Sequence, residues 1–149
     1  INSIVEIGTG LGDIIRNIYA TNKHCLDIDE NVLKANQFLS FFSNKGYRNI
    51  SFEQFDIYKN NLNDKYDLLI MVNWIHNIEQ EVLKKSFSEF ITQNLNNNGY
   101  LIFDILENKS YKYNHSVKNL LEGIENIEIL ISDKQYEYNR KLIYVRKTI

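Results

Sequence analysis

Short apolar runs alternate with amphipathic segments along most of the chain. Runs of strand length lie at residues 3–7, 23–28, 49–55, 66–72 and 100–106. Runs of this length, separated by segments with a helical repeat, are typical of β-α-β units around a mostly parallel sheet. The run at 66–72, YDLLIMV, is apolar almost throughout, as expected for a central parallel strand that is buried on both faces. The pattern therefore predicts an α/β fold.

Helical periodicity follows several of these runs. The first helix is expected at residues 13–19, and the second between Asp29, in an N-cap position, and Gly46. A third helix is expected at 79–95 and a short one near 117–121. These helices supply the connections that parallel strands require.

Polar segments separate the remaining elements. The asparagines at 96–98 predict a loop that turns at Asn98 and Gly99 into the strand at 100–106. The chain closes with two strand-like runs, at 126–132 and 141–147, with no room for a helix between them. These two strands should therefore pair in antiparallel fashion.

Composition narrows the class of protein. The 149 residues fit a single domain, spanning 1–149, with 44% hydrophobic and 24% charged side chains. A formal net charge of −2 provides no overall attraction to nucleic acid or anionic lipid. No apolar stretch reaches the roughly 18 residues of a membrane span and no signal peptide is visible, so we expect a cytoplasmic location. Cys25, the single cysteine, has no second thiol for a disulfide or a metal cluster and is expected in the core.

The first strand runs directly into a glycine-rich turn. Gly8, Gly10 and Gly12 stand at alternate positions before the next amphipathic segment. A dinucleotide fold would need a glycine at position 13, where Asp13 would repel a pyrophosphate. The phosphate-binding pattern G-x-x-x-x-G-K-[ST] does not occur. The turn thus suits a ligand whose adjacent part carries no phosphate, although the glycines alone would equally serve a tight strand-to-helix turn.

The segment VEIGTGLGD resembles the first motif of class I S-adenosylmethionine-dependent methyltransferases, hydrophobic-[DE]-x-G-x-G-x-G. LDIDENVLKAN and FEQFDIYK resemble the second and third motifs of that family, and YDLLIMVNWIHNI and NNGYLIFDIL its fourth and fifth strands. The resemblance covers nearly the whole chain in order, and the terminal hairpin fits it. It implies a three-layer Rossmann-like fold with a mostly parallel seven-stranded sheet in the order 3-2-1-4-5-7-6, and S-adenosylmethionine as the cofactor.

The resemblance also carries over site residues. It places the following residues against the cofactor: Glu6, Gly8, Thr9, Gly10, Gly12, Asp27, Ile28, Asp56, Ile57, Asn73 and Trp74. Asp27 would bind the ribose hydroxyls with its two carboxylate oxygens, and Asp56 would accept from the adenine amine, with Ile57 beside the ring. Glu6 would orient the turn or the methionine amino group. The simpler interpretations are a solvated loop carboxylate for Asp27, a strand end for Asp56 and a helix cap for Asp29.

His76 follows the fourth strand in the segment VNWIHNI. This segment resembles that of small-molecule O-methyltransferases and of polyketide methyltransferase domains, in which a histidine deprotonates the substrate. His76 is therefore the candidate general base, since imidazole titrates near neutral pH. The Trp or acidic residue usual after that histidine is missing, so a polar residue at a helix entrance is the alternative. Tyr111, Tyr113 and His115, in the loop at 107–116, suit either a small polar acceptor or packing on a neighbour.

The function expected from these residues is methyl transfer from S-adenosylmethionine to a small molecule, at an oxygen. An rRNA or tRNA methyltransferase is less favoured, because the basic residues form no stripe for phosphate contacts. The [DN]-P-P-[YFW] motif of DNA and some protein N-methyltransferases is absent, because the chain has no proline. The chain starts at Ile1 with a strand almost at once, so we expect an upstream segment, including the family's N-terminal cover helix, to be missing. A non-catalytic methyltransferase-like binding module is the remaining alternative, and the oligomeric state is left open.

Overall fold

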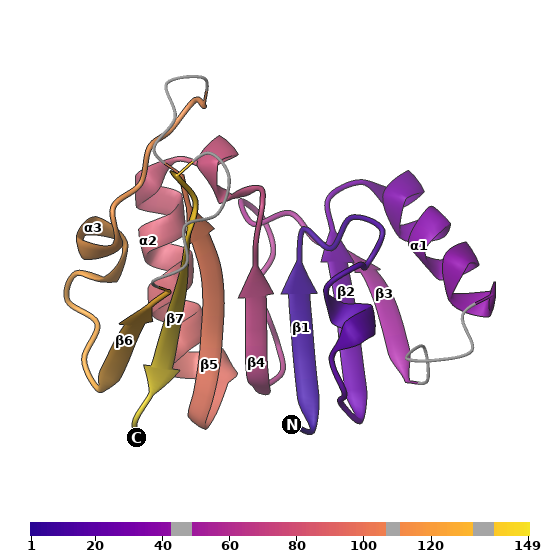
Figure 1. The fold of residues 1–149 in the computed structure, drawn as a ribbon, viewed down its shortest axis with the longest axis horizontal. Coiled ribbons are helices and arrows are strands. Elements are labelled where there is room, and N and C mark those ends of the chain that lie inside the picture. Colours follow the sequence, from indigo (N-terminus) through magenta and orange to yellow (C-terminus); the bar gives the residue numbers. More distant parts are fainter. Residues whose placement is uncertain (43–48, 107–110, 133–138) are drawn as a thin grey trace.

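The computed structural model of the chain describes residues 1–42, 49–106, 111–132 and 139–149. Within them, seven strands form one sheet in the order β3-β2-β1-β4-β5-β7-β6 (Figure 1). The strands are β1 (Ser3–Ile7), β2 (Asn22–Asp27), β3 (Ile50–Gln54), β4 (Tyr66–Met71), β5 (Leu95–Ile105), β6 (Ile127–Ile131) and β7 (Lys141–Lys147). This order confirms the prediction from the sequence. The expected helix end at Gly46 lies outside the described residues.

The first five strands along the sheet are parallel, and its last two pairings are antiparallel. β3, β2, β1, β4 and β5 run in the same direction. β7 pairs antiparallel with both β5 and β6, which confirms the predicted hairpin. The order reverses at β1, which lies between β2 and β4. A reversal of this kind opens a crevice beyond the carboxyl ends of the strands, where α/β proteins bind their ligands.

Three α-helices flank the sheet in the described part of the chain (Figure 1). α1 (Glu30–Phe42) packs against β2 and β3, whereas α2 (Gln80–Glu89) and α3 (Val117–Leu121) pack against each other. α1 begins where the sequence predicts, because the Asp29 carboxylate accepts hydrogen bonds from the backbone N–H groups of Asn31 and Val32. Asp29 is therefore a helix cap.

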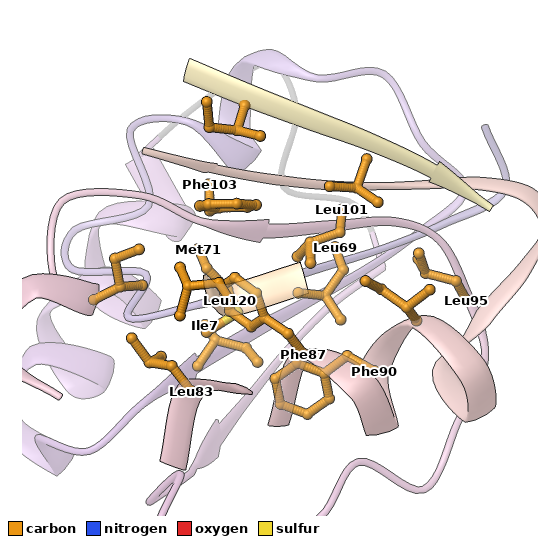
Figure 2. Close-up of a cluster of buried hydrophobic side chains, with 14 of the residues drawn as sticks. Ile7, Leu69, Met71, Leu83, Phe87, Phe90, Leu95, Leu101, Phe103 and Leu120 are labelled. Atoms are coloured by element: carbon orange, nitrogen blue, oxygen red, sulfur yellow. The ribbon is translucent and has the colours of Figure 1, made fainter. Parts of the chain in front are cut away.

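Each face of the sheet has its own core. The larger one joins apolar side chains of α2 and α3 to one face of β4, β5 and β7, and Figure 2 shows Phe87 among Leu69, Met71 and Phe103. The Phe87 and Phe103 ring centroids are 4.8 Å apart and tilted by 57°. On the opposite face, a smaller core includes Ile4, Ile15 and Cys25. Cys25 is fully buried, which confirms its assignment to the core, and burial raises its pKa to about 11.

The helix predicted at 13–19 is wrong. In this segment the chain forms a single 3-10 turn, η1 (Ile15–Asn17), and at Ile18 the backbone is already extended. β-Branched isoleucines are weak helix formers, and no side chain caps the turn. The N–H of Ile15 instead donates to the buried Glu6 carboxylate, at 3.1 Å. A tertiary hydrogen bond thus takes the place of a helix cap.

The segment between α2 and β5 also differs from the prediction. The helix expected at 79–95 becomes π-helical in η3 (Phe90–Asn94), and Leu95 already belongs to β5. The predicted asparagine loop at 96–98 is part of β5, although the pairing with β4 shifts register there and Asn98 has φ +62°. Asn94 explains the early end of the helix, since its side-chain amide donates to the carbonyls of Leu62 and Asp64 at 3.0 and 2.9 Å.

Among the helices in the described residues, none combines the length and the apolar character needed to cross a bilayer.

Candidate active site

A cavity of about 320 Å³ opens beyond the carboxyl ends of the parallel strands, at the switch point of the sheet. This volume is within the range of small-molecule sites. Eight residues expected at the cofactor line it, namely Gly8, Gly10, Asp27, Ile28, Asp56, Ile57, Asn73 and Trp74. They come from the end of β2 and from the segments that follow β1, β2, β3 and β4, so the fold brings together residues from half the length of the chain.

The glycine turn needs glycine for both conformation and space. Gly8, Gly10 and Gly12 all have positive φ, at +71°, +52° and +78°. A Cβ at Gly8 would collide with the indole of Trp74, and a Cβ at Gly12 with the side-chain amide of Asn36. A Cβ at Gly10 would meet no described atom within 4 Å. Gly10 therefore leaves free space beside the cavity, whereas Gly8 and Gly12 make room for neighbouring side chains.

Asp27 ends β2 with its carboxylate at the cavity. Its Oδ2 accepts from the Gly10 N–H and its Oδ1 from the Asp29 N–H, both at 3.0 Å. The two bonds orient the carboxylate and join β2 to the glycine turn. A carboxylate oxygen accepts more than one hydrogen bond, so both oxygens retain capacity for a ligand hydroxyl.

Both carboxylate oxygens of Asp56 contact residues of its own loop. Its Oδ1 accepts from the Tyr58 N–H at 3.0 Å, and its Oδ2 lies 2.8 Å from the Lys59 ammonium. The hydrogen bond from Lys59 and that from the Tyr58 N–H lower the pKa of Asp56. Ile57 packs against the larger core beside the cavity, and Ile28, although 61% exposed, also lines it. Ile28 and Ile57 each follow one of the two carboxylates along the chain and contribute apolar lining to the cavity.

Trp74, in the segment that follows β4, reaches across to the end of β1. Its Nε1 donates to the carbonyl of Ile7 at 2.5 Å, and the indole lies over Gly8. The residue before it, Asn73, has φ +78°. The direction of the chain at Asn73 therefore decides where the only tryptophan of the protein lies.

Glu6, Thr9 and Gly12 do not line the cavity. Glu6 and Thr9 are buried beneath the turn, where Glu6 Oε2 accepts from the Ile15 N–H and, at 3.4 Å, from the Thr9 hydroxyl. Burial raises the pKa of Glu6 to about 7, against the lowering effect of these two hydrogen bonds. Of the two roles expected for Glu6, the geometry fits the orientation of the turn.

His76 lies in η2 (Ile75–Asn77), between two residues of the cavity wall, Trp74 and Ile78, but does not line the cavity itself. It is 6% exposed, and its ring centroid is 3.9 Å from that of Tyr111. Burial lowers its pKa, and the charge of Asp104 partly opposes that effect. The imidazole is therefore predominantly neutral at pH 7.

The segment after β5 returns to η2. The Tyr113 N–H donates to the His76 carbonyl at 3.2 Å, and the Tyr113 hydroxyl lies 3.4 Å from Glu79 Oε1. His115 is buried with its Nε2 3.1 Å from the Ile75 carbonyl, and burial lowers its pKa. His115 thus packs inside the protein, and the half-buried Tyr111 covers the ring of His76. Residues 107–110 of the predicted loop lie outside the described residues.

Three polar residues that the sequence did not single out support the site. Asn36, fully buried in α1, donates from its amide to the Gly10 carbonyl at 3.2 Å. Asp104, fully buried in β5, accepts from the Asn73 N–H, and Arg140 pairs with Asp104. In the sequence, Asn36 is a polar residue on the inner face of a helix, and Asp104 is a charge within the apolar run YLIFDIL. Both patterns indicate a buried polar residue.

Similar folds occur among solved structures. NodS, an N-methyltransferase from Bradyrhizobium japonicum WM9, is 14% identical with a TM-score of 0.75, over 99% of this chain and 86% of NodS. The DhpI–SAH complex is 13% identical with a TM-score of 0.77, over 99% and 77% of the two chains. The CurJ carbon methyltransferase is 15% identical with a TM-score of 0.75, over 99% and 49%. Neither a protein-family model nor a curated protein matches the sequence. The chain has the class I S-adenosylmethionine-dependent methyltransferase fold.

Proposed function

We propose that the chain is an S-adenosylmethionine-dependent methyltransferase that acts on a small molecule. The observation that carries the proposal is the position of the Asp27 carboxylate, held at the end of β2 beside a glycine turn and facing a cavity at the switch point. Similar folds with bound SAM or SAH support the same cofactor. The small net charge of −2 offers no attraction to RNA, so a small-molecule acceptor is favoured over rRNA or tRNA.

The residues present fit the adenosyl part of the cofactor. Asp27 offers two oxygens, already oriented by the Gly10 and Asp29 N–H groups, to the vicinal ribose hydroxyls. Ile28 and Ile57 provide apolar walls for the adenine. Gly10 provides a stretch of backbone that no side chain shields from the ligand. Asp56 would accept from the adenine amine with the capacity that its bonds to Tyr58 and Lys59 leave free.

Asn73 and Trp74 also line the cavity, and the Trp74 indole lies against Gly8. Glu6 and Thr9 act one layer below, since Glu6 fixes the turn through the Ile15 N–H and the Thr9 hydroxyl. Bound there, S-adenosylmethionine supplies an electrophilic methyl group, so the protein has to orient the acceptor and remove its proton.

His76 is assigned as the base that accepts this proton. Its lowered pKa keeps the imidazole neutral and able to accept a proton at neutral pH. His76 itself does not line the cavity, but Trp74 and Ile78, close to it along the chain on either side, do, and the ring of Tyr111 packs against it. A base is needed most by a hydroxyl acceptor, and His76 is the reason for favouring oxygen. Similar folds include an N-methyltransferase and a carbon methyltransferase, so the fold itself leaves the acceptor atom open.

Calorimetric titration with S-adenosylhomocysteine tests the proposal. Asp27→Asn removes the charge at the proposed ribose contact, and we expect it to weaken binding by about 10- to 100-fold, the effect of one or two hydrogen bonds to a charged group. Asp29→Asn is the matched control, because Asp29 is exposed and caps α1 two residues away. Equal affinity of the Asp27→Asn variant and the wild type would remove Asp27 from the site.

A further inference from the structure

Asp104 is a carboxylate in the interior of the sheet. It lies near the end of β5 in the apolar run YLIFDIL and is 0% exposed. A buried charge is costly unless it is paired and hydrogen-bonded. The residues that Asp104 contacts therefore indicate its role in the structure.

The two oxygens of Asp104 contact different residues, one of which, Asn73, lines the cavity. Oδ1 accepts from the Asn73 N–H at 2.7 Å, and Oδ2 lies 3.3 Å from Nε of Arg140. Nη1 of Arg140 in turn donates to the side-chain oxygen of Asn73. The three residues thus form a closed ring of contacts that joins the end of β4, the end of β5 and the residue before β7.

The residue that both charges contact has an unusual backbone. Asn73 has φ +78°, a backbone conformation that residues other than glycine rarely adopt and that asparagine tolerates better than most. Asp104 contacts its N–H and Arg140 its side chain, so the pair holds Asn73 from both ends. Trp74 comes next, with its indole bonded to the Ile7 carbonyl across Gly8.

We infer that Asp104 and Arg140 are positioning residues, which hold Asn73 in its left-handed conformation and thereby keep Trp74 across the glycine turn. The consequence for binding rests on the proposed function: the pair preserves the shape of the cofactor cavity without lining it. An ion pair that only stabilised the fold would affect unfolding and leave ligand affinity unchanged.

Arg140→Met and Arg146→Met form a matched pair of variants. Arg146 lies on β7 and pairs with Glu128 at 3.5 Å, and it does not line the cavity. Arg140→Lys is the conservative variant, because it keeps the cation beside Asp104 but loses the planar fork that reaches Asn73 as well. We expect Arg140→Lys to retain a melting temperature close to that of wild type.

The first readout needs no ligand. Trp74 is the only tryptophan, so intrinsic fluorescence reports its surroundings directly. We expect the emission maximum to shift to longer wavelength in Arg140→Met and Arg140→Lys and to stay in place in Arg146→Met. An unchanged emission maximum in both Arg140 variants, measured on folded protein, would overturn the positioning role.

The second readout is the affinity for S-adenosylhomocysteine, measured well below the melting temperature. We expect Arg140→Met to weaken it about tenfold, because the variant loses the contacts of Arg140 with both Asp104 and Asn73. In an Asn73→Gly background, which removes the side-chain link and the conformational strain, the same substitution should have less than half that effect. Equal losses in both backgrounds would show that Arg140 does not act through Asn73.

The two proposals fail in different ways. A wild type that does not bind S-adenosylhomocysteine contradicts the proposed function, and the fluorescence shift alone then decides the positioning role. A wild type that binds, together with an Arg140→Met variant of equal affinity and unchanged emission, overturns the inference and leaves the proposed function intact.

Discussion

The indole of Trp74 donates a hydrogen bond to the carbonyl of Ile7, and this 2.5 Å contact joins the segment after β4 to the end of β1. Gly8 lies directly beneath the ring, with no room for a side chain. The two strands that meet at the switch point of the sheet are thus joined at the level of the proposed site. The glycine turn serves the packing of the protein as well as any ligand.

Gly8→Ala should therefore be much more damaging than Gly10→Ala. Both positions have positive φ, but only the Cβ at Gly8 would collide with Trp74. We expect Gly8→Ala to lower the free energy of unfolding by about 2–4 kcal/mol, from conformational strain and overpacking together. Gly10→Ala should lower it by about 1–2 kcal/mol, from conformational strain alone. Urea denaturation of the two variants measures the difference, and equal losses would contradict the packing role of Gly8.

Because Glu6 is buried, we expect the free energy of unfolding to depend on pH. Burial raises its pKa from 4.5 to about 7, so the folded protein holds a proton that the unfolded chain releases between these values. Wild-type stability should therefore fall, relative to Glu6→Gln, as the pH rises from about 4.5 to about 7. Above pH 7 the full difference is reached, on the order of 3 kcal/mol, because each unit of pKa shift corresponds to about 1.4 kcal/mol.

Urea denaturation of wild type and Glu6→Gln at pH 5 and pH 8 measures this effect, because the other titrating groups are common to both proteins. Thr9→Val is the control, since it removes a hydrogen bond that lowers the Glu6 pKa but keeps the carboxyl group. Its pH dependence should persist and move to higher pH. A stability difference between wild type and Glu6→Gln that stays constant from pH 5 to pH 8 would show that Glu6 is not the titrating group.

His76→Gln tests the proposed base. We expect turnover to fall by about 10²- to 10⁴-fold, the usual contribution of a positioned base, with the affinity for S-adenosylhomocysteine unchanged within twofold. In the wild type, kcat/KM should decline on the acid side below pH 6.5, because burial lowers the pKa of His76 from that value. The assay follows transfer of a labelled methyl group from S-adenosylmethionine to a hydroxyl compound found by screening.

His24→Gln is the matched control for that experiment. His24 lies in β2, where its Nδ1 is 3.0 Å from the Tyr66 hydroxyl, and it does not line the cavity. We expect its turnover to equal that of the wild type. Wild-type turnover in His76→Gln itself would refute the assignment of the base and, with it, the reason for favouring an oxygen acceptor.

The sheet could be predicted from the sequence because its signals are local and repeated. Each parallel strand is a short apolar run, and the motifs from VEIGTGLGD to FEQFDIYK fix their order by resemblance. The cap at Asp29 was visible for the same reason, since capping depends on residues within one turn. The absence of the helix expected at 13–19 could not be predicted, because the hydrogen bond from the Ile15 N–H to the Glu6 carboxylate exists only in the folded chain.

The support around the proposed site depends on distant parts of the sequence. Asp104 and Asn73 are 31 positions apart in the sequence, and Trp74 and Ile7 are 67 apart. A local sequence pattern therefore predicts neither contact. The polar Asn36 within α1 and the charged Asp104 within β5 were visible as exceptions to apolar patterns. Such exceptions indicate a buried polar contact, but only the fold identifies the partner.

A crystal structure of the protein with S-adenosylhomocysteine at saturating concentration would show directly whether Asp27 binds the ribose. We expect the nucleoside in the cavity, with both ribose hydroxyls within hydrogen-bond distance of the Asp27 carboxylate and the adenine between Ile28 and Ile57. An empty cavity at saturating ligand, or a nucleoside bound away from Asp27, would contradict it.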